Sequence, residues 1–112
     1  MTTIFSKIIQ GQLPAEKVFE NARILAIKDL HPVAPVHILI MPKKNIPDLQ
    51  SLEEEDLPLL QEIFLVAKRL AKEFKVENGY RFLTNNGPLA GQTIFHLHFH
   101  LIGGKQLTHG LG

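Results

Sequence analysis

In the stretch Phe95-His96-Leu97-His98-Phe99-His100-Leu101-Ile102-Gly103-Gly104, apolar residues and histidines alternate from Phe95 to Leu101. Alternation with a period of two is typical of a β-strand, which we place at residues 94–102. The histidines then share one face of the strand, and the phenylalanines and leucines between them share the other. We therefore expect the apolar face to pack under a helix and the imidazoles to face a cleft.

The rest of the chain predicts a sheet and a helix to cover it. Runs of β-branched, aromatic and other apolar residues bounded by turn residues predict strands at 17–20, 23–29, 36–41 and 80–85. A main helix is predicted from about residue 56 to 74, because apolar residues recur there at helical spacing, namely Leu57, Leu60, Ile63, Phe64, Ala67, Leu70, Ala71 and Phe74. This order predicts an α+β fold: a five-stranded antiparallel sheet, the main helix packed on it, and a short N-terminal helix at residues 4–10.

Signals at both ends of the main helix set its expected limits. Ser51, with Glu54 three residues later, predicts a capping box near its start. Pro58 cannot lie deep inside a helix, so we expect a short turn before the main helix. Asn78-Gly79 is expected to end it.

Composition excludes several classes of protein. The chain has 112 residues, a formal net charge of +1 and a hydrophobic fraction of 45%, which predicts a single globular domain over residues 1–112. A near-neutral chain carries no electrostatic sign of nucleic-acid or anionic-membrane binding. Cysteine is absent, which excludes disulfides, thiolate zinc sites and a catalytic thiol. No signal-peptide pattern or membrane-spanning run is visible, so we expect a cytoplasmic protein.

The histidine alternation allows three interpretations. It could be the solvated face of an edge strand. It could be a zinc site, since imidazoles two residues apart can share one ion, although no carboxylate is evident nearby. It could also be a catalytic site in which one imidazole attacks a phosphorus atom and its neighbours position protons and charge.

The segment His96-Leu97-His98-Phe99-His100-Leu101-Ile102 resembles the His-φ-His-φ-His-φ-φ signature of the histidine triad (HIT) family of nucleotide hydrolases and transferases. Other stretches resemble the Hint branch of that family in order and spacing. They are Thr3-Ile4-Phe5-Ser6-Lys7-Ile8-Ile9, Asp29-Leu30-His31-Pro32-Val33-Ala34-Pro35-Val36-His37, Met41-Pro42-Lys43-Lys44, Asn85, Ala90-Gly91-Gln92-Thr93 and Gly103-Gly104-Lys105-Gln106. The resemblance covers nearly the whole chain.

The resemblance implies a role for each matching residue. His98 would attack the α-phosphorus of a nucleotide and form a nucleotidyl-histidine that water hydrolyses, with no metal or other cofactor. His100 would donate to the phosphoryl oxygens, and the Thr93 hydroxyl would assist the leaving group. His96 and His37 would orient the nucleophilic ring. The nucleotide would be held by a loop and an amide near the phosphate (Gly91, Gln92), a phosphate-side contact (Asn85), a ribose-binding carboxylate (Asp29) and an apolar purine slot (Phe5, Ile8, Ile27, Leu30). His31 and His109 receive no role.

The implied activity is that of a purine nucleoside phosphoramidase acting on adenosine 5′-phosphoramidates. Two alternatives stay open: a dinucleoside polyphosphate hydrolase, and a nucleotide-binding module with incidental hydrolysis. The family also implies a twofold homodimer formed through the main helix and the fourth strand. The chain departs from the family in the loop at 86–90 and in the tail at 105–112, which lacks the Trp-Pro-Pro-Gly ending of animal relatives.

Overall fold

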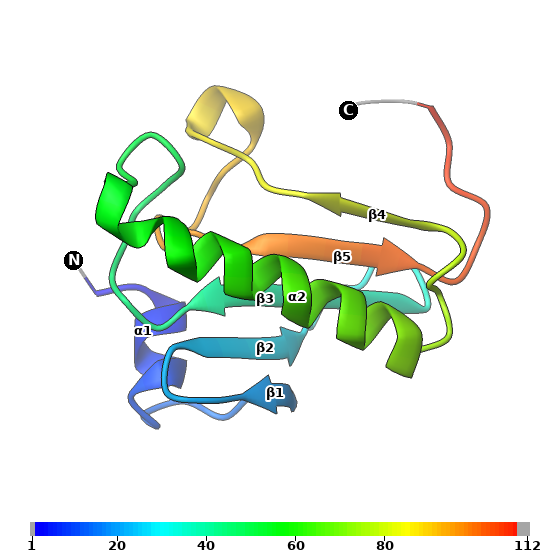
Figure 1. The fold of residues 1–112 in the computed structure, drawn as a ribbon, viewed down its shortest axis with the longest axis horizontal. Helices are drawn as coiled ribbons and strands as arrows, with labels where there is room; N and C mark the ends of the chain where they lie inside the picture. Colours follow the sequence, from blue (N-terminus) through cyan, green and yellow to red (C-terminus); the bar gives the residue numbers. More distant parts are fainter. Residues whose placement is uncertain (1, 110–112) are drawn as a thin grey trace.

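The computed structural model describes residues 2–109 and contains a five-stranded antiparallel sheet with strand order β1-β2-β3-β5-β4 (Figure 1). Its elements are α1 (Ile4–Ile9), β1 (Lys17–Glu20), β2 (Ile24–Lys28), β3 (Val36–Pro42), the 3-10 turn η1 (Glu54–Asp56), α2 (Leu57–Glu73), β4 (Tyr80–Leu83), the 3-10 turn η2 (Pro88–Ala90) and β5 (Phe99–Gly103). The predicted α+β class is confirmed. None of the helices described is long and apolar enough to cross a membrane.

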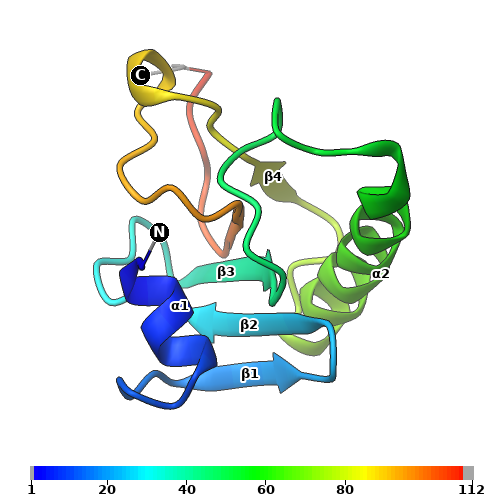
Figure 2. The ribbon, with the colours of Figure 1, turned by 90° about the vertical axis from the view of Figure 1, so that its left-hand side faces the viewer.

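The two helices cover opposite faces of the sheet (Figure 2). Strand β2 shows how one strand serves both, because its side chains alternate between two separate buried clusters. Ile24 and Ala26 pack in the cluster under α2, whereas Leu25 and Ile27 pack in the cluster under α1. The central part of the sheet is therefore buried on both faces, and the α1 face is the one that carries the candidate site.

Helix α2 lies on the sheet through a stripe that differs in part from the predicted one. Its buried residues are Ile63, Val66, Ala67, Leu70 and Ala71. Leu57 and Phe64, which were expected in the stripe, are 51% and 50% exposed. The helical period was right, but the predicted stripe was too broad and omitted Val66.

The start of α2 is set by residues other than those expected. Glu53 and Asp56 form the capping box of η1, and the Asp56 carboxylate accepts the Glu53 N–H at 3.0 Å. The hydroxyl and N–H of Ser51 donate to Asp48 instead, so the predicted Ser51 capping box is wrong. The short turn expected before Pro58 is present as η1.

The C-terminus of α2 lies where it was predicted, with Phe74 as the C-cap, but other residues than those expected end the helix. Lys75 adopts a left-handed conformation with φ of 62°. The N–H of Val76 donates to the Ala71 carbonyl at 2.8 Å and that of Lys75 to the Lys72 carbonyl at 3.1 Å, which is the Schellman pattern. The chain leaves the helix there, before the predicted Asn78-Gly79 stop.

Strand β5 begins at Phe99, so the predicted strand at 94–102 was too long. Its partner β3 ends at Pro42, whose nitrogen has no hydrogen to donate, and the last register pair is Ile40 with Phe99. The preceding segment is held by another contact, because the Leu97 N–H donates to the Ile46 carbonyl at 2.7 Å. His96 and His98 therefore lie just before the paired strand.

Candidate active site

A cleft of about 320 Å³ opens between α1, the ends of β2 and β5, and the loop that follows η2. Most residues predicted for the site line it: Phe5, Ile8, Ile27, Asp29, Leu30, Asn85, Gly91, Gln92, Thr93, His98 and His100. Two predicted residues, His37 and His96, are buried beside the cleft without lining it. The structure thus brings together residues from both halves of the sequence.

The apolar wall of the cleft comes from α1 and β2. Helix α1 is fixed by a reciprocal cap, in which the Thr3 hydroxyl accepts the Ser6 N–H and the Ser6 hydroxyl accepts the Thr3 N–H. This cap presents Phe5 to the cleft, with its ring centroid 4.8 Å from that of His98. Ile8 and Ile27 are buried beside it, but Leu30 is 82% exposed and lies at the rim, outside the enclosed slot in which it was expected.

The main chain fixes the tautomer of His98. Its Nδ1 atom lies 2.7 Å from the His96 carbonyl oxygen, which only accepts hydrogen bonds, so the proton is on Nδ1 and Nε2 carries a lone pair. The Thr84 hydroxyl donates to the His98 carbonyl at 2.6 Å and holds this residue in place. Burial lowers the pKa of His98, which favours the neutral ring at neutral pH.

His96 differs from the expectation that all three imidazoles face the cleft. Its side chain is 1% exposed, and its Nε2–H donates to the Pro42 carbonyl at 2.7 Å. Burial lowers its pKa, and its Nδ1 atom has no hydrogen-bond partner among the described residues. His96 contacts His98 through its backbone carbonyl, because its ring is directed to the end of β3.

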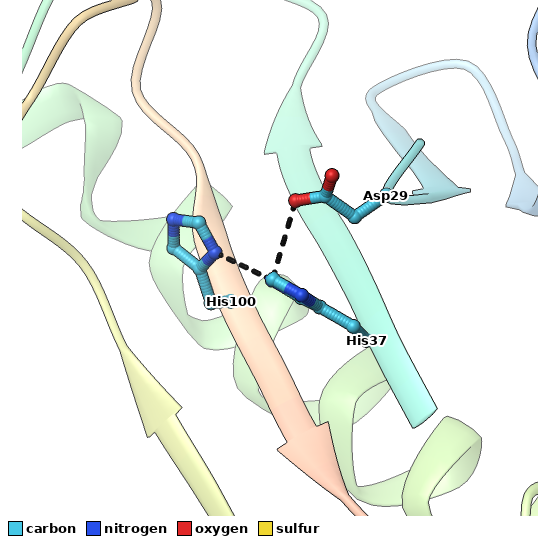
Figure 3. A group of neighbouring side chains, drawn as sticks. All are labelled: Asp29, His37 and His100. Atoms are coloured by element: carbon cyan, nitrogen blue, oxygen red, sulfur yellow. Dashed lines mark hydrogen bonds and ion pairs between the residues drawn. The ribbon is translucent and has the colours of Figure 1, made fainter. Parts of the chain in front are cut away.

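Asp29, His37 and His100 form a polar cluster beside the cleft, joined by one hydrogen bond and one close contact to the carboxylate (Figure 3). The Val33 N–H donates to His37 Nδ1 at 3.2 Å, so the proton of the neutral His37 ring is on Nε2. That Nε2 atom lies 2.9 Å from His100 Nδ1 and 3.3 Å from Asp29 Oδ2. With Nδ1 as an acceptor, His100 carries its own proton on Nε2, the remaining nitrogen of a ring that lines the cleft.

The histidines of the site are neutral at neutral pH. Burial, and then the neighbouring His98 and His37, lower the pKa of His100 to about 4. Burial also lowers the pKa of His37, against the opposing effect of the Asp29 carboxylate. Two imidazole nitrogens are therefore left for a ligand in the cleft: the neutral Nε2–H donor of His100 and the unprotonated Nε2 of His98.

The Asp29, His37 and His100 cluster also bears on the zinc interpretation. No carboxylate is evident near the histidines in the sequence, but the fold brings Asp29 to His37 and His100, with one potential ligand atom from each within 4.8 Å of the others. However, His37 Nε2 and His100 Nδ1 are 2.9 Å apart, whereas two nitrogens on one tetrahedral zinc ion lie about 3.3 Å apart. The 2.9 Å separation fits a hydrogen bond between the two rings. Binding of zinc by both nitrogens would require the rings to move apart.

The side chain of Gln92 connects three segments of the loops before β5 through hydrogen bonds. Its side-chain amide donates to the carbonyls of Pro47 and Ile94 at 2.9 and 3.0 Å, and its Oε1 accepts the Gly87 N–H at 2.8 Å. The amide that was expected near a phosphate is therefore occupied. Gly91 has φ of 91°, a conformation that favours glycine, and this turn brings Thr93 to the cleft.

Some contributions were not foreseen from the sequence. Val33 and Thr84 act through hydrogen bonds that orient His37 and His98, and nothing in their local sequence signals this. His31, which received no role, lines the cleft, and its N–H donates to Asp29 Oδ1 at 2.8 Å. In the sequence, His31 is marked only by its position two residues after Asp29, at the end of a strand. That spacing is equally typical of an Asx turn, so it does not identify a site residue.

Known proteins resemble this chain in sequence and in fold. Residues 10–107 match the sequence model of the HIT domain. An uncharacterized HIT-like protein of Chlamydia muridarum is 50% identical over 107 residues, which cover 96% of this chain and 85% of that protein. The crystal structure of a HIT family hydrolase from Legionella pneumophila Philadelphia 1 superposes with a TM-score of 0.96 at 42% identity, covering 99% of this chain and all of that one.

A more distant structure belongs to a histidine triad nucleotide-binding protein from Candida albicans. It has a TM-score of 0.82 at 32% identity and covers 97% of this chain and 85% of that one. The HIT domain match at residues 10–107 includes Asp29, His37 and the three histidines at 96, 98 and 100, and it begins just after α1. This chain belongs to the HIT domain family.

Proposed function

We propose that the protein is a nucleotide hydrolase of the Hint branch, a purine nucleoside phosphoramidase that cleaves the P–N bond of adenosine 5′-phosphoramidates. The observation that carries this proposal is the His98 ring, whose Nδ1–H is bonded to the His96 carbonyl and whose Nε2 lone pair is left for a substrate. The similarity to a HIT family hydrolase and to a histidine triad nucleotide-binding protein supports the same class of activity.

The shape of the cleft supports a nucleotide as the ligand. Phe5, Ile8 and Ile27 provide an apolar wall for a purine. Asp29 lies on the same cleft at the end of β2, where its carboxylate can accept hydrogen bonds from ribose hydroxyls. A nucleotide held in this way has its α-phosphate near His98, His100 and Thr93, with Asn85 beside them.

In the first step the Nε2 lone pair of His98 forms a bond to the α-phosphorus, and the P–N bond to the amine breaks. The electron pair stays on the leaving nitrogen, which gains a proton from solvent while the Thr93 hydroxyl hydrogen-bonds to it. His100 donates its Nε2–H to a phosphoryl oxygen and stabilises the charge that develops there. The product of this step is a nucleotidyl-histidine and a free amine.

In the second step water attacks the phosphorus, the bond to His98 breaks, and its electron pair returns to Nε2. The proton released by water passes to solvent, and the nucleoside monophosphate leaves. Because Nδ1 stays protonated on the His96 carbonyl, the ring in the intermediate is cationic and therefore a good leaving group. The same hydrogen bond thus assists both steps.

The trapping experiment is a single turnover with adenosine phosphoramidate labelled at phosphorus, quenched in alkali, in which a phosphohistidine bond survives better than in acid. We expect the label on His98, its absence in His98→Ala, and no effect of a chelator. Release of product with no trapped label, stopping when zinc is removed, would instead favour a metal site on the same histidines.

A substrate comparison separates the proposal from its enzymatic alternative. A phosphoramidase should have a higher kcat/KM for adenosine 5′-phosphoramidate than for diadenosine polyphosphates, and a dinucleoside polyphosphate hydrolase should show the reverse order. A nucleotide-binding module would bind AMP tightly and turn over neither substrate at a useful rate.

We also propose that residues 1–112 form one HIT domain that pairs as a twofold homodimer through α2 and the edge strand β4. Phe64 is half-exposed on α2, and its ring centroid lies 5.7 Å from that of Phe82 on β4. Leu57 and Leu65 add exposed apolar surface to the same helix. Light scattering should give twice the chain mass, and Leu65→Arg should give the monomer. A cytoplasmic location stays a prediction from the sequence.

A further inference from the structure

His37 Nε2 makes one hydrogen bond and lies close to a second polar group. It is hydrogen-bonded to His100 Nδ1 at 2.9 Å, and Asp29 Oδ2, just after the end of β2, lies 3.3 Å away (Figure 3). The alternative site for the ring proton, His37 Nδ1, is occupied by the Val33 N–H. The His37 N–H, which is hydrogen-bonded to His100 on the phosphate side of the cleft, therefore also lies close to a carboxylate on the ribose side.

Asp29 is held rigidly in this position by the main chain. Its N–H donates to the His37 carbonyl at 3.0 Å, which extends the β2–β3 ladder by one residue. Its Oδ1 accepts the His31 N–H at 2.8 Å, so Oδ2 is the oxygen that faces His37. Because Asp29 also lines the cleft, a ligand hydroxyl that donates to this carboxylate changes the charge that faces the His37 N–H.

We propose that Asp29 couples the binding of the ribose hydroxyls to the donor state of His100, acting through His37. A hydroxyl that donates to Asp29 weakens the electrostatic attraction of this carboxylate for the nearby His37 N–H. The existing hydrogen bond from His37 to His100 Nδ1 then strengthens, which holds the His100 proton more firmly on Nε2, facing the phosphate. The ribose hydroxyls are thus activating groups for P–N cleavage as well as binding groups, and Asp29 is a positioning residue for His100.

Charges around the pair agree with this direction of coupling. The Asp29 carboxylate is the charged group that acts on both rings, and it raises the pKa values of His37 and His100 against the larger effect of burial. The nearest cation in the sequence, Lys28, is paired with Glu16 at 2.8 Å. A hydroxyl bonded to Asp29 therefore alters the charge that acts on the His37 N–H beside His100.

The kinetic test compares ribose with 2′,3′-dideoxyribose adenosine phosphoramidates at saturating concentration. This inference rests on the proposed function, and in the wild-type protein we expect removal of the hydroxyls to lower kcat about tenfold in addition to raising KM, as for the loss of one positioning hydrogen bond. In Asp29→Asn the two substrates should have equal kcat. A matched variant at the rim, Leu30→Ala, should change KM and keep the tenfold difference in kcat. A wild-type effect confined to KM would overturn the coupling.

A second measurement does not depend on turnover. Nitrogen NMR of the imidazoles in His98→Ala follows His37 Nε2 and His100 Nδ1 during titration with adenosine or 2′,3′-dideoxyadenosine. Adenosine should shift both signals, whereas bound dideoxyadenosine should leave them near their free values. Equal shifts with the two nucleosides would overturn the coupling and leave nucleotide binding intact. Failure of both nucleosides to bind would reject the proposed function itself.

Discussion

The Nδ1 atom of His98 lies 2.7 Å from the carbonyl oxygen of His96, two residues earlier in the chain. This contact is made where the chain has not yet joined the β3–β5 ladder, so the His96 carbonyl is available to the imidazole. A carbonyl oxygen cannot donate, and the tautomer of the proposed nucleophile therefore follows from the backbone. The first prediction depends on this relationship.

His98→Ala should lower kcat for adenosine phosphoramidate by more than about a thousandfold, because the attacking nitrogen is lost. AMP affinity and Tm should change little, since the apolar wall and Asp29 are unaltered. Stopped assays, calorimetry with AMP and thermal melts measure the three quantities. His109→Ala, an equivalent change at an exposed residue that does not line the cleft, is the control. Equal losses of AMP affinity and Tm in His98→Ala would argue against its catalytic role.

The buried histidines make stability depend on pH. The pKa of His100 is about 4 in the folded protein and near the usual value of 6.5 when unfolded, so the unfolded chain binds more protons between these values. The free energy of unfolding should therefore fall as pH drops from about 6.5 to 4, by about 3 kcal/mol from this group. Lowered pKa values of His37, His96 and His98 act in the same direction.

Thermal melts at several pH values between 7.5 and 4.5 test this dependence. His100→Ala should show a shallower decrease of Tm than the wild-type protein across that range, because one of the titrating groups is absent. Paired carboxylates with lowered pKa values, such as Asp56 and Glu62, lose their contribution only below about pH 4.5 and so fall outside this window. Identical pH slopes for the two proteins would show that His100 titrates normally.

Patterns with a short period were predictable from the sequence, and contacts between distant segments were not. Alternation correctly placed Leu97, Phe99 and Leu101 in the core under α2. It could not show that the ring of His96 is directed to the Pro42 carbonyl, 54 residues away in sequence. The position of His37 beside His100 depends on the β3–β5 register, in which Leu39 pairs with His100.

The resemblance supplied residues that the physical patterns alone left ambiguous. The local sequence around Asp29 is typical of a turn, and only the folded chain shows that its carboxylate lies 3.3 Å from His37. Gln92 shows the opposite case, because the expectation of an amide near a phosphate did not anticipate that its side chain ties three loop segments together. Hydrogen-bond partners of a buried side chain depend on tertiary structure, which local sequence does not encode.

Gln92→Ala should therefore act mainly on stability. The substitution leaves the Pro47 and Ile94 carbonyls and the Gly87 N–H without their partner at a side chain that is 4% exposed. We expect a loss of about 2 kcal/mol in the free energy of unfolding, measured by urea denaturation. Thr93→Ala, at the exposed neighbouring position, should lower activity with little effect on stability. A Gln92→Ala protein of wild-type stability would contradict the structural role.

Lys75→Gly should stabilise the fold by about 0.5–1 kcal/mol, because Lys75 occupies a left-handed conformation that glycine adopts without a Cβ penalty. Lys75→Ala keeps the Cβ and should give no such gain. Lys72→Gly, inside the last turn of α2, should destabilise by about 1 kcal/mol. Urea denaturation of the three variants measures these differences, and a gain in Lys75→Ala equal to that in Lys75→Gly would assign the effect to loss of the lysine side chain.

The hydrogen bond of 2.9 Å between His37 and His100 predicts that the two residues act as one unit in catalysis. His37→Ala should lower kcat by about tenfold to a hundredfold, since His100 loses the donor that fixes its proton on Nε2. In His100→Ala that donor has nothing to orient, so adding His37→Ala should lower kcat no further. Thr93→Ala and His37→Ala act on different groups of the substrate, the leaving group and the phosphoryl oxygens through His100, so their effects on kcat should add. Additive losses in the His37 and His100 pair would show that His37 acts by some route other than His100.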